Sequence, residues 1–242
     1  MTITENQTVS ELAALSLNAV RTFERRGIDY CCGGKRPLRE VCQERGIAPH
    51  ELIAELSAAL EQAKQDDRDW NSAPLSELVA HINRKHHEYL KLEMPRISER
   101  LKKVVQVYGA QDAATLSTLP AVYQALRDEL EPHMVKEETI LFPFVERIEA
   151  LANRNLPLPP LPFGTIGNPI HCMESEHETA GEALRQMRAA TNDYALPAHA
   201  CATYKALFDS LQDLEADLHL HIHLENNILF PRVIALECSM RA

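Results

Sequence analysis

The amino-acid sequence predicts an all-α protein in which a small helical domain precedes a four-helix bundle. The 242 residues are rich in Ala, Leu and Glu, which favour helices, and they include only 8 Gly and 5% aromatic residues. Apolar residues recur at helical spacing through several long segments. In addition, a segment of related sequence occurs twice, at 133–143 and 221–231, and each copy places a Glu four residues after a His.

Residues 1–65 are expected to form the small helical domain. Thr8 and Glu11 have the spacing of a capping box, and Gly27 is suited to end a helix in the left-handed conformation. The segment 29–34 reads Asp-Tyr-Cys-Cys-Gly-Gly and predicts a tight loop. Three helices are therefore expected, over residues 8–27, 37–46 and 49–64.

Residues 66–74 are interpreted as a linker, because they are polar, lack an apolar period and end in a proline. The bundle is then expected to occupy residues 75–242. Its four helices are predicted near residues 75–107, 119–152, 170–191 and 197–238. The connection 153–169 contains five prolines, which favour an extended chain and predict a long crossover.

Composition and charge limit the classes of partner. The formal net charge of −10 argues against nucleic acid, because phosphate binding needs a basic surface. The first ten residues lack the features of a secretory signal, and no apolar run approaches the roughly 18 residues of a membrane span. The 6 cysteines show no disulfide-framework spacing. We therefore expect a cytoplasmic protein with reduced thiols and with neither nucleic acid nor membrane as a partner.

The repeated segment predicts metal ligands. His133 and Glu137 recur as His221 and Glu225, and both pairs are followed by Ile-Leu-Phe-Pro. Residues four apart lie one turn apart on the same face of an α-helix, so each pair can direct an imidazole and a carboxylate to one point. The repetition of both the polar pair and the apolar tail favours a ligand set over two unrelated surface pairs.

The other two bundle helices also carry histidines. Candidates on the first are His81, His86 and His87, and candidates on the third are His171 and His177. One His from each helix would complete a set of four imidazoles and two carboxylates, which suits two bridged irons. The apolar period of the first helix slightly favours His86 over His87.

Two other metal-site classes fit less well. A ferritin-like site needs Glu-x-x-His on each of two helices, and the chain has only Glu174 to His177. A zinc protease needs His-Glu-x-x-His, which is absent from the sequence.

The motifs together resemble those of the RIC (repair of iron centers) family, also called the ScdA type. The resemblance is carried by the loop 29–34, the two His-x-x-x-Glu segments and, between them in the chain, the segment 173–177 (Met-Glu-Ser-Glu-His). It covers nearly the whole chain and implies a small ScdA-type domain followed by a hemerythrin-like bundle. Many members have Val-His-Gly at the end of the first bundle helix, where this chain has Val-Tyr-Gly. Tyr108 is therefore left open as a ligand, as a hydrogen-bond donor or as neither.

The resemblance implies a non-haem centre of two irons, bridged by carboxylates and by an oxo or hydroxo group. The implied ligands are His87, His133, Glu137, His177, His221 and Glu225. It selects His87 over His86 and assigns Glu137 and Glu225 as the bridges. Further polar residues expected around such a site are His219, His223, Glu138 and Glu174.

The resemblance also implies repair of iron-sulfur clusters damaged by nitric oxide or oxidants, by donation of iron from a site that is reachable. The expected partners are damaged iron-sulfur proteins or the cluster assembly machinery, and a homodimer stays open. One alternative is a hemerythrin-like sensor that binds dioxygen or nitric oxide. Another is a di-iron nitric oxide reductase, which would need an electron donor because the chain has no flavin or nicotinamide motif. Whether the protein is an enzyme therefore stays open.

Cys31 and Cys32 are expected to act as thiols that pass iron or electrons. The adjacent Lys35 and Arg36 are candidates for lowering the thiol pKa values. The other four cysteines are expected to pack as small apolar residues.

Overall fold

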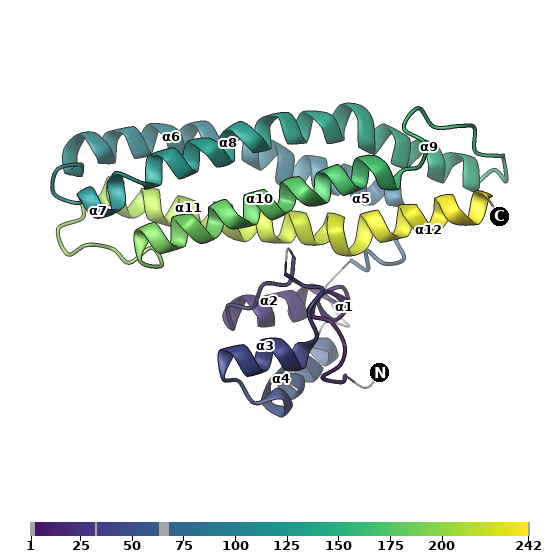
Figure 1. The fold of residues 1–242 in the computed structure, drawn as a ribbon, viewed down its shortest axis with the longest axis horizontal. Helices are drawn as coiled ribbons and strands as arrows, with labels where there is room; N and C mark the ends of the chain where they lie inside the picture. Colours follow the sequence, from purple (N-terminus) through teal and green to yellow (C-terminus); the bar gives the residue numbers. More distant parts are fainter. Residues whose placement is uncertain (1–2, 32, 63–67, 242) are drawn as a thin grey trace.

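The computed structural model describes residues 3–31, 33–62 and 68–241, and these ranges contain helices and two isolated bridges but no strand (Figure 1). The prediction of an all-α protein is confirmed. Figure 1 shows long, roughly parallel helical rods, with the N-terminal helices attached near the middle of the bundle. None of the described helices is long and apolar enough to cross a membrane.

The N-terminal helices are α1 (Val9–Ala13), α2 (Leu17–Arg25), α3 (Leu38–Arg45) and α4 (Pro49–Gln62). The capping box is confirmed, because Thr8 Oγ1 accepts from the Glu11 amide and the Thr8 amide donates to Glu11 Oε2. The expectation of one helix over 8–27 is wrong. Ser16 adopts an extended conformation and caps a second helix by accepting from the Ala19 amide, a competing role that serine often takes.

Each of three bundle rods is an α-helix interrupted by one π turn. The first comprises α5 (Leu75–Ile82), η2 (Asn83–His87) and α6 (Glu88–Tyr108); the second, α8 (Leu119–Lys136), η3 (Glu137–Leu141) and α9 (Phe142–Ala152); the fourth, α11 (Ala202–Leu224), η4 (Glu225–Leu229) and α12 (Phe230–Arg241). The third rod is the continuous helix α10 (Gly167–Thr191), and a short α7 (Ala113–Leu116) joins the first two rods. All four predicted rods are present.

Two predicted helix starts differ from the structure. Helix α10 begins three residues early, at Gly167, because Pro169 lies in its first turn, where proline sacrifices no helical hydrogen bond. Helix α11 begins at Ala202 instead of residue 197, after a loop that contains Pro197. Of the predicted connection 153–169, residues 153–166 are non-helical, as the prolines predicted, and residues 167–169 belong to α10.

The apolar interior is divided into three clusters. One lies among α1–α4 and includes Ile222 of α11, and Leu220 of the same helix packs against it. The other two lie within the bundle, one centred on α6, α8 and α11 and the other on α5, α9 and α12. Because α1–α4 have their own core, we retain 1–65, 66–74 and 75–242 as the proposed domain division; residues 66 and 67 lie outside the described residues.

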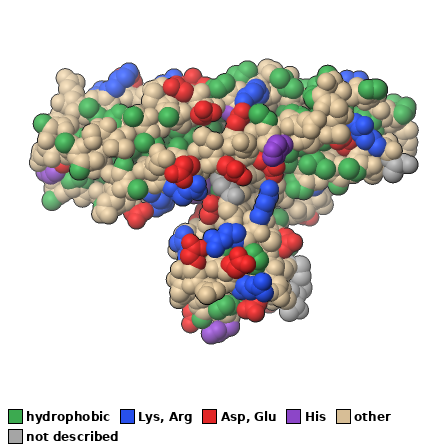
Figure 2. All heavy atoms as spheres, in the orientation of Figure 1, with side chains coloured by type: hydrophobic (Ala, Val, Ile, Leu, Met, Phe, Trp, Pro, Cys, Tyr) green, Lys and Arg blue, Asp and Glu red, His purple; other side chains and the backbone are tan. Residues whose placement is uncertain are grey.

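Polar contacts attach the N-terminal helices to the bundle. Figure 2 shows acidic and basic side chains gathered where the two parts meet. Lys35 lies 3.5 Å from Glu174, and Arg185 lies 3.9 Å from Asp29. Such part-exposed pairs contribute little stability individually, so they orient the two parts more than they hold them together.

The start of the bundle depends on a carboxylate from another helix. Pro74 precedes α5 and provides no side-chain cap, and the amides of Leu75 and Ser76 donate instead to Glu149 of α9, at 2.5 and 2.9 Å.

We predict that Glu149→Ala lowers the free energy of unfolding by about 1–2 kcal/mol, because two helix-terminal amides lose their acceptor. Urea unfolding followed by circular dichroism measures this change.

Glu146→Ala is the matched control, because Glu146 is exposed on the same helix and makes no hydrogen bond or ion pair with the described residues. Equal effects of the two substitutions would contradict the capping role.

Candidate metal centre

Six polar side chains converge in the middle of the bundle. They are His87, His133, Glu137, His177, His221 and Glu225. All six are buried, and they form two groups of four whose potential ligand atoms lie within 4.8 Å of one another. One group contains His87 and His221, the other contains His133 and His177, and both contain Glu137 and Glu225. The two carboxylates are therefore shared between two neighbouring positions for a metal ion.

The π turns occur at this layer. His87 ends η2, Glu137 begins η3 and Glu225 begins η4. Because η3 and η4 start only at the carboxylates, each preceding His keeps the α-helical spacing that predicted a shared face. His133 Nε2 lies 3.3 Å from Glu137 Oε2, and His221 Nε2 lies 3.1 Å from Glu225 Oε1. Single π turns within α-helices are frequently found at functional sites.

Three of the imidazoles are oriented by hydrogen bonds at Nδ1. The partners, each at 2.8 Å, are Glu138 for His87, Glu176 for His133 and the Asn226 amide oxygen for His177. Carboxylate and amide oxygens only accept, so each Nδ1 carries a hydrogen and each Nε2 is directed into the cluster. This arrangement, in which an acceptor fixes the outer nitrogen of a ligand histidine, is typical of metal sites.

The inner nitrogens face one another closely. Nε2 of His87 lies 3.2 Å from Nε2 of His221, and Nε2 of His133 lies 3.1 Å from Nε2 of His177. For His133 and His177, whose Nδ1 atoms both carry the hydrogen, two neutral rings cannot hydrogen-bond through Nε2, because each would offer a lone pair. A cation between these two nitrogens removes this conflict.

The carboxylates lack ordinary partners. Both oxygens of Glu137 and Oε2 of Glu225 are buried without a hydrogen-bond partner of suitable geometry among the described residues. The nearest groups are imidazole nitrogens, which lie 3.3 Å from Glu137 Oε2 and 3.2 Å from Glu225 Oε2. An uncompensated buried carboxylate is costly. Two cations would compensate both carboxylates, so the donor set fits a di-iron site, with two imidazoles and two shared carboxylates for each ion.

Protonation replaces the cations when no metal is bound. Burial and the neighbouring Glu225 act to raise the pKa of Glu137, but the His133 and His87 imidazoles outweigh them and lower it. Burial opposes a charge on His133, yet Glu137 and Glu225 raise its pKa to about 9. The metal-free cluster therefore holds a proton on His133 at neutral pH, and metal binding must displace it.

The structure brings His87, and not His86, into the cluster. Nδ1 of His86 lies 2.9 Å from Asp217 Oδ1, and its ring stacks on that of His221, with centroids 5.3 Å apart. The apolar period that favoured His86 correctly indicated a buried residue, but His86 packs behind the candidate ligand His221 and is not itself in the cluster. His81 and His171 are also outside the two groups.

Tyr108 lies far from the cluster. It ends α6, a helix of 21 residues that begins directly after His87, so about 30 Å of helix separate the two. Its ring contacts His199 and Tyr204 instead. Of the roles left open for Tyr108, ligation and hydrogen bonding to a ligand are excluded by this position.

The residues around the ligands are only partly those predicted. Glu138 contacts His87 as expected, whereas Glu174 contacts Lys35. Sequence reasoning assigned no role to Glu176 or Asn226, although both adjoin candidate ligands. Their hydrogen bonds cross between helices, and only the packing of the rods reveals them.

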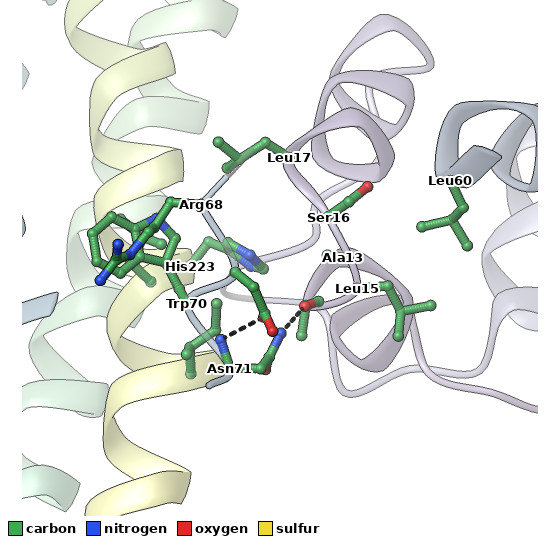
Figure 3. A pocket seen from close by; sticks show the side chains of 13 residues that line it. Ala13, Leu15, Ser16, Leu17, Leu60, Arg68, Trp70, Asn71 and His223 are labelled. Carbon is green, nitrogen blue, oxygen red and sulfur yellow. Dashed lines mark hydrogen bonds between the residues drawn. The ribbon is translucent and has the colours of Figure 1, made fainter. Parts of the chain in front are cut away.

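His219 and His223 contact the N-terminal domain instead of the cluster. Both rings pack edge-on against Tyr30, with centroids 6.2 and 5.5 Å away. Burial lowers the pKa of His223 to about 3, so this residue is neutral at physiological pH. His223 also reaches a cavity of about 290 Å³ between the bundle, residues 13–17 and residues 68–71 (Figure 3). The cavity thus adjoins the helix segment that carries Glu225.

The cysteine loop lies against the bundle, and in Figure 1 the connection between α2 and α3 reaches toward it. Cys31 is buried, with Sγ 3.5 Å from Asp29 Oδ1; Cys32 lies outside the described residues. Lys35 pairs with Glu174 and Arg36 pairs with Glu44, and a lowering of the thiol pKa values by these two cations stays a prediction.

The other cysteines differ from the expectation of apolar packing. Of the four cysteines outside the loop, only Cys42 is buried. Cys172, Cys201 and Cys238 are exposed. Cys172 and Cys238 lie on the outer faces of α10 and α12, and Cys201 lies just before α11. Amino-acid composition alone does not predict whether one small residue is exposed.

We predict that His87→Ala removes metal from the centre whereas His86→Ala retains it. His87 contributes Nε2 to the cluster, while His86 lies behind His221. Metal content per chain after reconstitution with ferrous iron, measured by plasma mass spectrometry, distinguishes the two neighbours. Loss in His86→Ala and retention in His87→Ala would reverse the assignment.

We also predict that Glu176→Ala weakens metal binding by about 10–100-fold, because His133 loses the acceptor that orients it. Glu178→Ala is the matched control, since Glu178 is exposed two residues later and makes no hydrogen bond or ion pair with the described residues. Competition with a chelator of known affinity measures both. Unchanged affinity in Glu176→Ala would show that the contact does not support the site.

Comparison with known proteins shows which family this chain resembles. Residues 5–60 match ScdA_N, described as a domain of unknown function (DUF542), and residues 78–233 match the hemerythrin HHE cation binding domain. The iron-sulfur cluster repair protein YtfE of Escherichia coli O81 (strain ED1a) is 35% identical over 232 residues, which cover 96% of this chain and 98% of that protein. YtfE of Shigella boydii serotype 4 (strain Sb227) is similar to the same extent.

These similarities include both helical parts of the chain, and the hemerythrin match contains all six residues of the buried cluster. The chain belongs to the RIC family of iron-sulfur cluster repair proteins.

Proposed function

We propose that the protein binds two irons in the buried cluster and donates iron to iron-sulfur clusters damaged by nitric oxide or oxidants. The observation that carries the proposal is the pair of overlapping groups that share Glu137 and Glu225. A mixed set of imidazole and carboxylate ligands binds iron without the soft thiolates that would retain it more firmly. Iron in this reading is the cargo that the protein delivers.

The ligand side chains can compensate for the loss of charge when iron is released. Four Nε2 atoms and two carboxylates would hold the irons, and both carboxylates would be shared between the two positions. As iron leaves, a proton at Nε2 of His133 compensates Glu137, in keeping with the raised pKa of this histidine. The buried cluster therefore need not retain an unpaired carboxylate.

Burial sets a requirement on release. The expectation of a reachable site is wrong for the described conformation, because Glu137 and Glu225 are 0% exposed. Delivery therefore requires local opening. We propose that this opening occurs where η4 contacts the cysteine loop. Cys31 and Cys32 are the proposed thiols for transfer of iron or electrons.

The partners follow from the family. The relatives are named iron-sulfur cluster repair proteins, and we propose damaged iron-sulfur proteins or the cluster assembly machinery of the cytoplasm as partners. A homodimer is compatible with this function but is not required by it.

The number of ligands supports a second candidate function. Each metal position has four protein groups, fewer than the six ligands that iron commonly accepts, so a small external ligand has room. Reversible binding of dioxygen or nitric oxide, or reduction of nitric oxide with an external electron donor, would use these positions. The buried setting suits such chemistry more than an open donor site would.

The test compares iron delivery with free iron. An iron-sulfur enzyme inactivated by nitric oxide should regain activity with the iron-loaded protein faster than with the same concentration of ferrous salt, and Glu225→Ala should abolish the difference. Equal recovery with free iron would contradict donation. Turnover of nitric oxide with a reductant, without loss of iron, would instead support the second candidate.

A further inference from the structure

One side chain connects the metal-binding turn to the cysteine loop. Asn227 lies in η4, two residues after Glu225, and its amide nitrogen Nδ2 lies 3.0 Å from the carbonyl oxygen of Tyr30 and 2.9 Å from Nδ1 of His223. The amide nitrogen carries two hydrogens, so it can donate to both acceptors. We propose that Asn227 is a positioning residue that holds the Cys31 loop in register with η4. Its use in iron transfer rests on the proposed function.

The loop side of this connection is narrowly defined. A Cβ at Gly34 would lie 2.4 Å from the Tyr30 carbonyl oxygen, so only glycine lets the loop close against this carbonyl. The Tyr30 hydroxyl donates to Glu24 at 2.8 Å, and the Tyr30 ring packs edge-on against His223. The carbonyl, the ring and the hydroxyl of Tyr30 therefore each have a defined contact. Tyr30 immediately precedes Cys31, so these contacts also position the start of the cysteine pair.

On the bundle side, three consecutive residues of η4 each make a different contact. Glu225 belongs to both metal groups, the Asn226 amide oxygen accepts from His177 Nδ1 at 2.8 Å, and Asn227 donates to the loop. A displacement of η4 when the centre gains or loses metal would therefore be transmitted to Tyr30. Linkage is reciprocal, so a loop that is ordered by the metal also increases metal affinity.

Other bonds near this junction involve the linker and are made by residues outside the metal-binding turn η4. The Asn71 amide nitrogen donates to the Ala14 carbonyl oxygen at 2.6 Å (Figure 3). Arg232 donates to the carbonyl oxygens of Trp70 and Ala73, both at 2.6 Å. Asn71 is a matched control for Asn227, because it is the same residue type in the same kind of bond, and its partner lies outside the cysteine loop.

The test measures alkylation of Cys31 by iodoacetamide, resolved by fragment mass spectrometry, in metal-free protein and in protein loaded anaerobically with ferrous iron. In the unsubstituted protein, loading should slow alkylation several-fold. In Asn227→Ala the metal-free rate should rise about tenfold, as expected for loss of the two hydrogen bonds, and the rate should no longer depend on iron. Asn71→Ala should retain the dependence. Exposed Cys238 provides an internal reference for reagent reactivity.

Protection by iron that persists in Asn227→Ala would overturn the proposal, because it would show direct shielding or ligation of the thiol. A metal dependence lost equally in Asn71→Ala would also overturn it, since general docking would then explain the effect. If Asn227→Ala does not fold, Gly34→Ala displaces the same carbonyl from the loop side and should give the same loss of dependence. These readouts require no cluster repair, so failure of the proposed function leaves them interpretable.

Discussion

The structure depends on a layer of four imidazoles and two carboxylates buried between two apolar clusters. On one side lie the core residues of α6, α8 and the first part of α11, and on the other side lie those of α5, α9 and α12. Unpaired charges in such a layer would destabilise the bundle. The layer is therefore tolerable only when cations or protons compensate Glu137 and Glu225, which makes the folding of this region and the occupancy of the site parts of one equilibrium.

The same layer explains why three rods contain π turns and why the N-terminal domain attaches here. Each π turn adds a residue to its rod beside a candidate ligand, and the added residue changes which side chains face outward beyond it. In η4 the outward residue Asn227 meets the Tyr30 carbonyl, so the local irregularity serves the metal and the cysteine loop together. A regular helix would present Glu225 equally well but would aim the residues that follow it differently.

The sequence predicted the main elements because their signals are local. The repeated His-x-x-x-Glu pairs depend on a spacing of four within one helix, and the linker and crossover depend on proline and polar composition. The break at Ser16 was missed because a serine cap competes with an uninterrupted apolar period. The choice between His86 and His87 could not be made from periodicity, since both are buried and a π turn ends at His87. Contacts between helices, such as Glu176 to His133, have no local signal.

The central claim is that two metal positions share Glu137 and Glu225. Crystals of the protein loaded anaerobically with iron, measured on both sides of the iron absorption edge, test it most directly. We predict two anomalous peaks in the buried layer, one beside His87 and His221 and the other beside His133 and His177, with both carboxylates contacting both peaks. A single peak, or peaks that do not share the two carboxylates, would contradict the account.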